Sequence, residues 1–340
     1  MSEAMVLADR AHRAGDLEAA EDLYRRCLHD YPADARHRLA LVLSGLGEPG
    51  EIETLLREAV EADPAFPQAR HSLALHLLSL GRYAEGWPLY EARREIPALT
   101  AALPPLPFPE WRGEPLAGKR IVAFGEQGFG DQIMFARFLP ALFTLGAEVT
   151  YAVSPELLAL FPGSVPLLGP WTIRRPDYWA LVGSLPLHLG VTLETLPAPF
   201  PLARDGRGGG VGVVVAGNPR HGHDAIRSLR GDDAGALRAL GRHLGPDATG
   251  ARDFGETASI IAALDLVISV DTAVAHLAAS MGKPTWVLLP SRHTDWRWLR
   301  DRSDSPWYPS VTLYRQEAPF DWSAVLQRVT AGAQALTEKM

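Results

Sequence analysis

The sequence predicts an α + α/β protein, with a helical N-terminal part followed by two parallel-sheet α/β halves. Three observations support this prediction. Residues 1–95 have apolar side chains at helical spacing and no strand-like alternation. Residues 96–115 are rich in proline, and from residue 116 onward apolar runs of strand length alternate with amphipathic stretches. A chain of 340 residues is long enough for two or three domains.

Residues 1–95 contain an internal repeat of large, small, turn and aromatic positions. The positions that match are Leu7, Ala8, Gly15, Ala20, Tyr24, Cys27 and Pro32, and then Leu73, Ala74, Gly81, Tyr83, Gly86 and Tyr90. The middle unit, residues 35–66, is interrupted by Gly47, Pro49 and Gly50. The pattern resembles tetratricopeptide repeats, which stack helical hairpins into a concave surface that commonly holds peptide segments. In this register Cys27 is a packing residue.

The remaining boundaries follow from composition. Residues 96–115 form an extended linker, because proline fixes φ and removes a backbone donor. We expect a first Rossmann-like half at 116–205, a second at 206–320 and a glycine-rich hinge at Asp205–Gly210. The closing amphipathic segment, 321–340, is expected to pack back on the first half.

In the first half, a predicted strand at Arg120–Phe124 is followed by a glycine-rich loop. The backbone amides of Gly128 and Gly130 could approach an anion at the start of the next helix. The dinucleotide-binding fingerprint is incomplete, because Ile133 stands in place of its third glycine, and a nicotinamide-dependent oxidoreductase is therefore disfavoured. Asp131 has two interpretations: a helix cap, or a general base that deprotonates a hydroxyl.

In the second half, a predicted strand at Leu266–Val270 leads directly into a helix. The amides of Thr272 and Ala273 should therefore face the carboxyl end of the sheet, where a diphosphate would be stabilised by the helix dipole. Asp271 would repel that diphosphate, so we assign it to capping or to sugar hydroxyls. His276 shares a helical face with Thr272, although by itself it is more typical of an interior histidine.

The loop after the predicted strand Val211–Ala216 contains Asn218, Arg220 and Arg227. An arginine here would neutralise the charge of a departing diphosphate. His221, His223 and Asp224 in the same loop are weak indications of a metal, and a solvated loop is the simpler interpretation. The aromatic residues Trp296, Trp298, Trp307 and Tyr308 are expected to pack beneath the second half.

Composition excludes several classes of function. The chain has 33 Lys and Arg against 40 Asp and Glu, a net charge of −7, which disfavours nucleic-acid binding. One cysteine excludes an internal disulfide and a cysteine-based zinc site. The acidic start and the absence of a long apolar run predict a cytoplasmic protein without a membrane span.

Four motifs in order resemble one family. They are Gly-Glu-Gln-Gly-Phe-Gly-Asp-Gln-Ile (125–133), Ala-Gly-Asn-Pro-Arg-His (216–221), Ser-Val-Asp-Thr-Ala-Val-Ala-His-Leu-Ala (269–278), and Asp-Trp-Arg-Trp-Leu with Asp-Ser-Pro-Trp-Tyr-Pro (295–299 and 304–309). Together with the repeats, they resemble bacterial tetratricopeptide proteins that carry a heptosyltransferase-like glycosyltransferase domain.

That resemblance implies a GT-B fold, a nucleotide-sugar donor, and inverting transfer to an acceptor hydroxyl without a metal or another cofactor. It implies that Asp131 is the catalytic base and that Asp271, Thr272 and His276 contact the nucleotide-sugar donor. The basic residue of the second half maps onto Arg227 or Arg220. The repeats would hold a protein as the acceptor.

One departure from the family leaves an alternative open. Such domains usually carry a strand between Leu240 and Phe254, and here residues 241–250 are short and have little strand character. The alternative is therefore a non-catalytic repeat scaffold with a degenerate transferase domain that binds a protein partner. The sequence does not indicate the sugar, the nucleotide, the acceptor or the oligomeric state.

Overall fold

The computed structural model describes residues 3–99, 103, 105–168, 174–206, 208–220 and 222–337. The chain divides into two compact units. The helical unit comprises Met1–Thr100 together with Ser291–Arg300, and the α/β unit comprises Ala101–Pro290 together with Asp301–Met340. Across the described residues, every helix is too short or too polar to cross a membrane.

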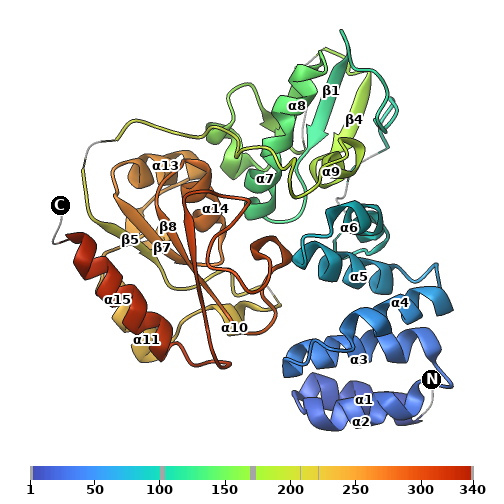
Figure 1. The fold of residues 1–340 in the computed structure, drawn as a ribbon. Coiled ribbons are helices and arrows are strands. Elements are labelled where there is room, and N and C mark those ends of the chain that lie inside the picture. The colour runs from blue at the N-terminus through green and yellow to red at the C-terminus, as the bar shows by residue number, and fades with distance from the viewer. Residues whose placement is uncertain are drawn as a thin grey trace. The chain divides into compact units, whose positions relative to one another are not determined.

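The helical unit is built from α-helices that pack against their neighbours in sequence (Figure 1). The helices are α1 (Glu3–Ala14), α2 (Leu17–Cys27), α3 (Pro32–Leu46), α4 (Ile52–Ala62), α5 (Pro67–Ser79) and α6 (Tyr83–Tyr90), followed by the 3-10 helix η1 (Glu91–Glu95). Pro32 and Pro67 each begin a helix, where the missing N–H has no intrahelical partner to lose. Gly47 ends α3 in the left-handed conformation.

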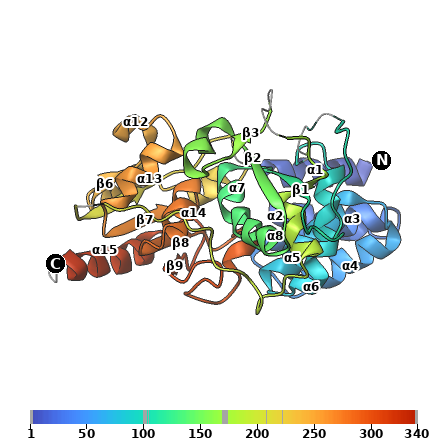
Figure 2. The same cartoon turned by 90° about the horizontal axis from the view of Figure 1, so that it is seen from above.

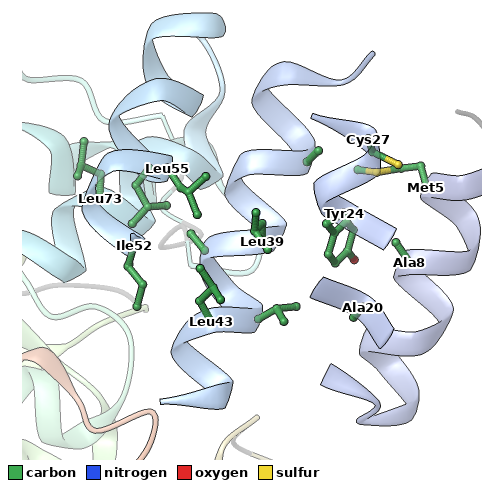
Figure 3. Packing of buried hydrophobic residues seen from close by; sticks show 14 of the residues in the cluster. Met5, Ala8, Ala20, Tyr24, Cys27, Leu39, Leu43, Ile52, Leu55 and Leu73 are labelled. Carbon is green, nitrogen blue, oxygen red and sulfur yellow. The ribbon is translucent and has the colours of Figure 1, made fainter. Parts of the chain in front are cut away.

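The core of the helical unit depends on close approach between helices (Figure 3). Ala8 on α1 and Ala20 on α2 are fully buried, and their small side chains bring the two helices together. Tyr24 fills the space beside them, and its hydroxyl donates to Asp9 over 2.7 Å. Cys27 is buried in the same cluster, as the repeat pattern predicts.

The segment Ser291–Arg300 belongs to the helical unit, although it follows a strand of the α/β unit in sequence. Its 3-10 helix η5 (Trp296–Trp298) packs against α5. The Trp296 ring lies 5.5 Å from the Trp87 ring and 6.2 Å from the Tyr90 ring. The prediction that Trp296 packs beneath the second half is therefore wrong, because the aromatic side chains of α6 provide its contacts.

The α/β unit contains two parallel sheets (Figures 1 and 2). The first has the order β3-β2-β1-β4, with β1 (Arg120–Phe124), β2 (Glu148–Val153), β3 (Val165–Pro166) and β4 (Tyr178–Leu181). The second has the order β6-β5-β7-β8-β9, with β5 (Val211–Val214), β6 (Arg242–His243), β7 (Leu266–Val270), β8 (Thr285–Leu289) and β9 (Val311–Arg315).

Helices connect these strands. Those of the first half are α7 (Phe129–Phe135), η2 (Ala136–Phe138), α8 (Leu139–Thr144), η3 (Pro155–Leu160), η4 (Val182–Ser184) and α9 (Leu185–His188). Those of the second half are α10 (Asp224–Arg227), α11 (Gly231–Arg238), α12 (Pro246–Thr249), α13 (Phe254–Ala262) and α14 (Ala273–Ser280), and α15 (Ser323–Thr337) follows the last strand.

The C-terminal helix is where the structure departs from the predicted domain plan. Helix α15 packs against α11 and β9, and its apolar residues Val325 and Val329 join the core beneath the second sheet (Figure 1). Gly332 allows this contact, because a Cβ there would lie 2.7 Å from the Trp286 ring on β8. The prediction that this helix packs on the first half is therefore wrong.

The predicted hinge is held against α13. A Cβ on Gly206 would lie 2.3 Å from the backbone carbon of Ala262, and one on Gly208 would lie 2.6 Å from the carbonyl oxygen of Ala263. Glycine is required here because the two backbones touch.

Candidate active site

Each sheet has one point where the strand order reverses. In the first sheet, β2 and β4 lie on opposite sides of β1, and in the second, β6 and β7 lie on opposite sides of β5. Ligands of open parallel sheets bind outside the carboxyl ends of the strands at such points. The loops after β1, β4, β5 and β7 are therefore the places to look for function.

Two buried polar side chains fix the loop after β1. The Glu126 carboxylate accepts a hydrogen bond of 2.9 Å from the Gly183 N–H, directly after β4. Gln132 reaches the end of β2, where its Oε1 accepts from the Ser154 N–H and its Nε2 donates to the Ser154 hydroxyl, both over 2.9 Å. The loop is thus tied to both neighbouring strands.

Asp131 is the third residue of α7, and its carboxylate accepts a 3.0 Å hydrogen bond from the Gly128 N–H. The capping interpretation of Asp131 thus has a geometric basis, and its role as a base stays a prediction. Burial raises the pKa of the nearby Tyr151 hydroxyl, and the charges of Glu126 and Asp131 raise it further. This hydroxyl donates to the Gln132 carbonyl oxygen over 2.6 Å.

In the second half, Thr272 stands at the N-cap of α14 with extended backbone. Its hydroxyl lies 3.0 Å from that of Ser269 and makes no capping bond to the helix. Asp271 is largely buried, with one carboxylate oxygen 3.8 Å from Nε2 of His276. Nδ1 of His276 lies 2.9 Å from the Tyr308 hydroxyl, which makes His276 a fully buried side chain with polar partners.

The structure brings the two helix starts together. Helices α7 and α14 pack against each other, and Gly130 lies at this contact. A Cβ on Gly130 would lie 2.8 Å from Cδ2 of His276 and 3.6 Å from the Cα of Ala273. Asp131 is the residue after Gly130, and Thr272 is the residue before Ala273. The proposed base and the proposed phosphate-binding turn are therefore chain neighbours of the residues that make this contact. The absence of a side chain at Gly130 allows α7 and α14 to approach each other closely.

The loop after β5 reaches the same sheet edge as Thr272. Val214 pairs with Ser269 between β5 and β7, and Gly217 and Thr272 follow these two residues by three positions, beyond the ends of the strands. The guanidinium of Arg227 covers Gly217, where a Cβ would lie 2.5 Å from Nη2, and it pairs with Asp224 at 3.4 Å.

The other two predicted residues of this loop lie differently. The Asn218 side chain accepts a 3.0 Å hydrogen bond from the Arg220 N–H, and the Arg220 side chain is exposed. Arg227 is therefore the arginine that is held beside the strand end. His221 lies outside the described residues, and in the rest of the described chain no three His, Cys, Asp or Glu side chains gather in a way that could hold a metal.

Sequence reasoning missed Glu126, Gln132 and Tyr308. Glu126 and Gln132 both lie inside the glycine-loop motif, and the available signal was a polar residue in this motif beside a buried strand, Glu126 in the loop and Gln132 in α7. Tyr308 was assigned to packing. Its ring lies 4.9 Å from the Arg137 guanidinium, and its neighbour Trp307 lies 4.6 Å from the same group, so this pair joins the two halves.

A family model matches part of the second half. The family model of glycosyltransferase family 9 (heptosyltransferase) matches residues 242–319, a stretch that includes β7, α14 and Tyr308. This match supports sugar transfer as the chemistry of the second half.

Over 350 residues the chain is 29% identical to Protein FlbA of Caulobacter vibrioides, covering 82% of this chain and 58% of that protein. An O-GlcNAc transferase mutant of Thermobaculum terrenum is similar over 93% of this chain and 57% of its own, at 14% identity and a TM-score of 0.26. The chain thus spans less than two thirds of either protein.

Two further solved structures cover a smaller share of this chain. A glycosyl transferase family 9 protein of Veillonella parvula is 12% identical, with 65% of this chain and 91% of that chain covered and a TM-score of 0.39. The iron-containing dodecameric glycosyltransferase TibC of enterotoxigenic E. coli is 16% identical, with 62% and 68% covered and a TM-score of 0.40.

Proposed function

We propose that this protein is a glycosyltransferase that moves a sugar from a nucleotide-sugar donor to an acceptor hydroxyl by metal-independent, inverting transfer. The observation that carries the proposal is the contact between Gly130 and α14. It joins the start of α7, which carries Asp131, to the start of α14, which lies inside the region matched by the glycosyltransferase family.

The proposed roles follow from this arrangement. Asp131 takes the proton of the acceptor hydroxyl as the new glycosidic bond forms. The bond between the sugar and the diphosphate breaks, and the amides of Thr272 and Ala273 stabilise the departing anion at the start of α14. Arg227, beside the neighbouring strand end, neutralises part of its charge.

The acceptor in this proposal is a protein held by the helical unit as tetratricopeptide repeats hold peptides. The succession of packed helices supports this assignment. So does a hollow of about 340 Å³ in that unit, lined by His12, Asp34, His37, Arg38, Leu41, Phe66 and Gln68. Leu41→Arg should abolish transfer to protein and leave nucleoside-diphosphate binding unchanged.

The decisive experiment is transfer from a panel of radiolabelled nucleotide sugars by the purified full chain and by Asp131→Asn. We expect the variant to lose about 10²–10⁴-fold in rate, because it cannot accept the proton. Asp16→Asn is the matched control, since Asp16 also caps a helix, accepting from the Ala19 N–H over 3.2 Å in the other unit. If Asp131→Asn retains full activity, Asp131 is a cap alone.

A non-catalytic scaffold is the second candidate, and one observation favours it. Strand β6 at the edge of the second sheet is only Arg242–His243, followed directly by the short helix α12. Thermal shifts with ADP, UDP and GDP separate the candidates, because a ligand at about 100 times its Kd stabilises the folded state by about 2.7 kcal/mol. A shift with one of them favours the enzyme, and no shift favours the scaffold.

A further inference from the structure

Tyr308 lies in the chain between β8 and β9 and is fully buried. Its hydroxyl is 2.9 Å from Nδ1 of His276, and its ring faces the Arg137 guanidinium of the first half at 4.9 Å. Arg137 in turn donates to the Trp307 carbonyl oxygen over 2.7 Å and to the Met134 carbonyl oxygen over 3.1 Å. Tyr308 therefore contacts both halves beside the candidate site.

The opposite nitrogen of His276 faces a carboxylate. Nε2 lies 3.8 Å from Oδ1 of Asp271, the residue before the N-cap of α14. A neutral imidazole has one N–H donor and one lone pair. The arrangement that suits both neighbours places the N–H on Nε2, toward the carboxylate, and the lone pair on Nδ1, where it accepts from the Tyr308 hydroxyl. The opposite tautomer would turn a lone pair toward Asp271.

The orientation of the ring also matters for the first half. Cδ2 of His276 occupies the space that a side chain on Gly130 would need. A rotated imidazole would push α7 away from α14 and move Asp131 with it. A buried ring in this place needs a partner that fixes its angle, and Tyr308 is the residue in hydrogen-bond contact with Nδ1.

We propose that Tyr308 is a positioning residue of the active site. Its hydroxyl fixes the Nε2–H tautomer and the angle of His276, and His276 holds Asp271 and the start of α14 against the start of α7, which carries Asp131. This inference rests on the proposed function, and it adds a residue that acts through His276 without touching the donor.

The tautomer can be measured without any ligand. The full chain, labelled with ¹⁵N in its 11 histidines, is studied by NMR, and the His276 signals are identified by their loss in His276→Gln. We expect the Nε2–H tautomer in the wild type and a mixture of tautomers in Tyr308→Phe. A wild-type Nδ1–H tautomer would overturn the proposal, and this test remains valid even if Tyr308→Phe does not fold.

The second measurement is kinetic. Tyr308→Phe should lower kcat/KM for nucleotide-sugar transfer about 10- to 100-fold, because small displacements of reacting groups are costly. The matched control is Tyr24→Phe, which removes another buried tyrosine hydroxyl, the one that donates to Asp9 in the helical unit.

The outcomes separate the two proposals. Wild-type kinetics in Tyr308→Phe refute the positioning role. An absence of transfer and of ADP, UDP and GDP binding in the wild type refutes the proposed function, while the tautomer of His276 still decides whether Tyr308 fixes the ring.

Discussion

The two units bury polar side chains in different ways. In the α/β unit, buried carboxylate and amide groups follow the strands and bond to backbone amides, as Glu126 does with Gly183 and Gln132 with Ser154. In the helical unit, the buried polar groups include histidines inside α3 and α5, such as His37 and His76. The first arrangement holds loops at a sheet edge, whereas the second places titratable rings within a helical core.

This difference predicts which side chains should affect activity when they are lost and which should affect folding stability when they are protonated. Groups that hold the loops of the α/β unit also determine the positions of Asp131 and Thr272, so their loss should affect activity. His37, in contrast, lies 3.0 Å from the Ser72 hydroxyl between α3 and α5, so the protonation of such histidines of the helical unit should affect folding. The predictions below test this contrast.

The largest expected effect is acid destabilisation of the helical unit. Burial lowers the pKa of His37, His71 and His76 from the usual 6.5 to about 4. As the pH falls, these histidines are protonated in the unfolded chain before they are protonated in the folded one. The stability that the neutral rings contribute is therefore complete above pH 6.5 and is lost as the pH falls toward 4. The loss is about 3 kcal/mol each for His37 and His71. Hydrogen exchange at pH 7.5, 5.5 and 4.5 should show α3 and α5 opening before β7.

His71→Phe is the control for the acid prediction. The phenyl ring can keep the stacking on Tyr90, whose centroid lies 5.7 Å away, and it does not titrate. Between pH 4 and 6.5 it should reduce the slope of unfolding free energy against pH by about 1.4 kcal/mol per pH unit. Earlier opening of the second sheet than of the helices in acid would contradict the comparison.

Trp296→Ala should have the next largest effect. Trp296 is only 5% exposed and packs on Trp87 and Tyr90, so removing it leaves a cavity that costs about 3–5 kcal/mol. Differential scanning calorimetry with hydrogen exchange should assign that loss to α5 and α6. Phe320→Ala, at a side chain that is 67% exposed, should leave stability unchanged. A loss confined to the α/β unit would show that Ser291–Arg300 does not stabilise the helices.

The sequence predicted the bounds of helices and strands better than the packing between them. The strands at Arg120–Phe124 and Leu266–Val270 have the expected bounds, because buried parallel strands are continuous apolar runs between turn residues. The sequence did not predict β4 or β9, both of which follow segments with frequent prolines, or the two-residue strands β3 and β6. The packing of α15 and of Trp296 depends on residues distant in sequence, which local pattern does not reveal.

The sequence predicted only part of the candidate site, because local pattern does not reveal contacts between residues distant in sequence. The positions of Asp131 and Thr272 follow from strand–loop–helix patterns, and the structure brings their neighbours into contact. The link from Tyr308 to His276 joins residues far apart in sequence, and only the fold shows it.

Gly130→Ala should have a moderate effect in the α/β unit. The added methyl would lie 2.8 Å from His276, whose buried ring has little room to move, and overpacking of this kind costs about 1–3 kcal/mol. Gly235→Ala is the matched control within a helix, because nothing lies within 4 Å of its Cβ position, and it should stabilise by about 0.5–1 kcal/mol. Urea unfolding of both variants measures the contrast, and equal effects would show that Gly130 is not a contact point.

The smallest effect is expected from the surface ion pairs of Glu53 in the helical unit, one of which links α4 to the start of α6. Glu53 on α4 accepts from Arg57 on the same helix and from Arg82 at the start of α6, over 2.8 and 2.7 Å. Glu53→Gln should cost about 0.2–1 kcal/mol at low salt, and the loss should shrink in 1 M NaCl because exposed charges are screened. Glu256→Gln breaks an ion pair with Arg252 at the start of α13 in the α/β unit. It should have no measurable effect on the stability of the helical unit. A salt-independent loss in Glu53→Gln would mean that packing of the side chain, and not its charge, joins α4 to α6.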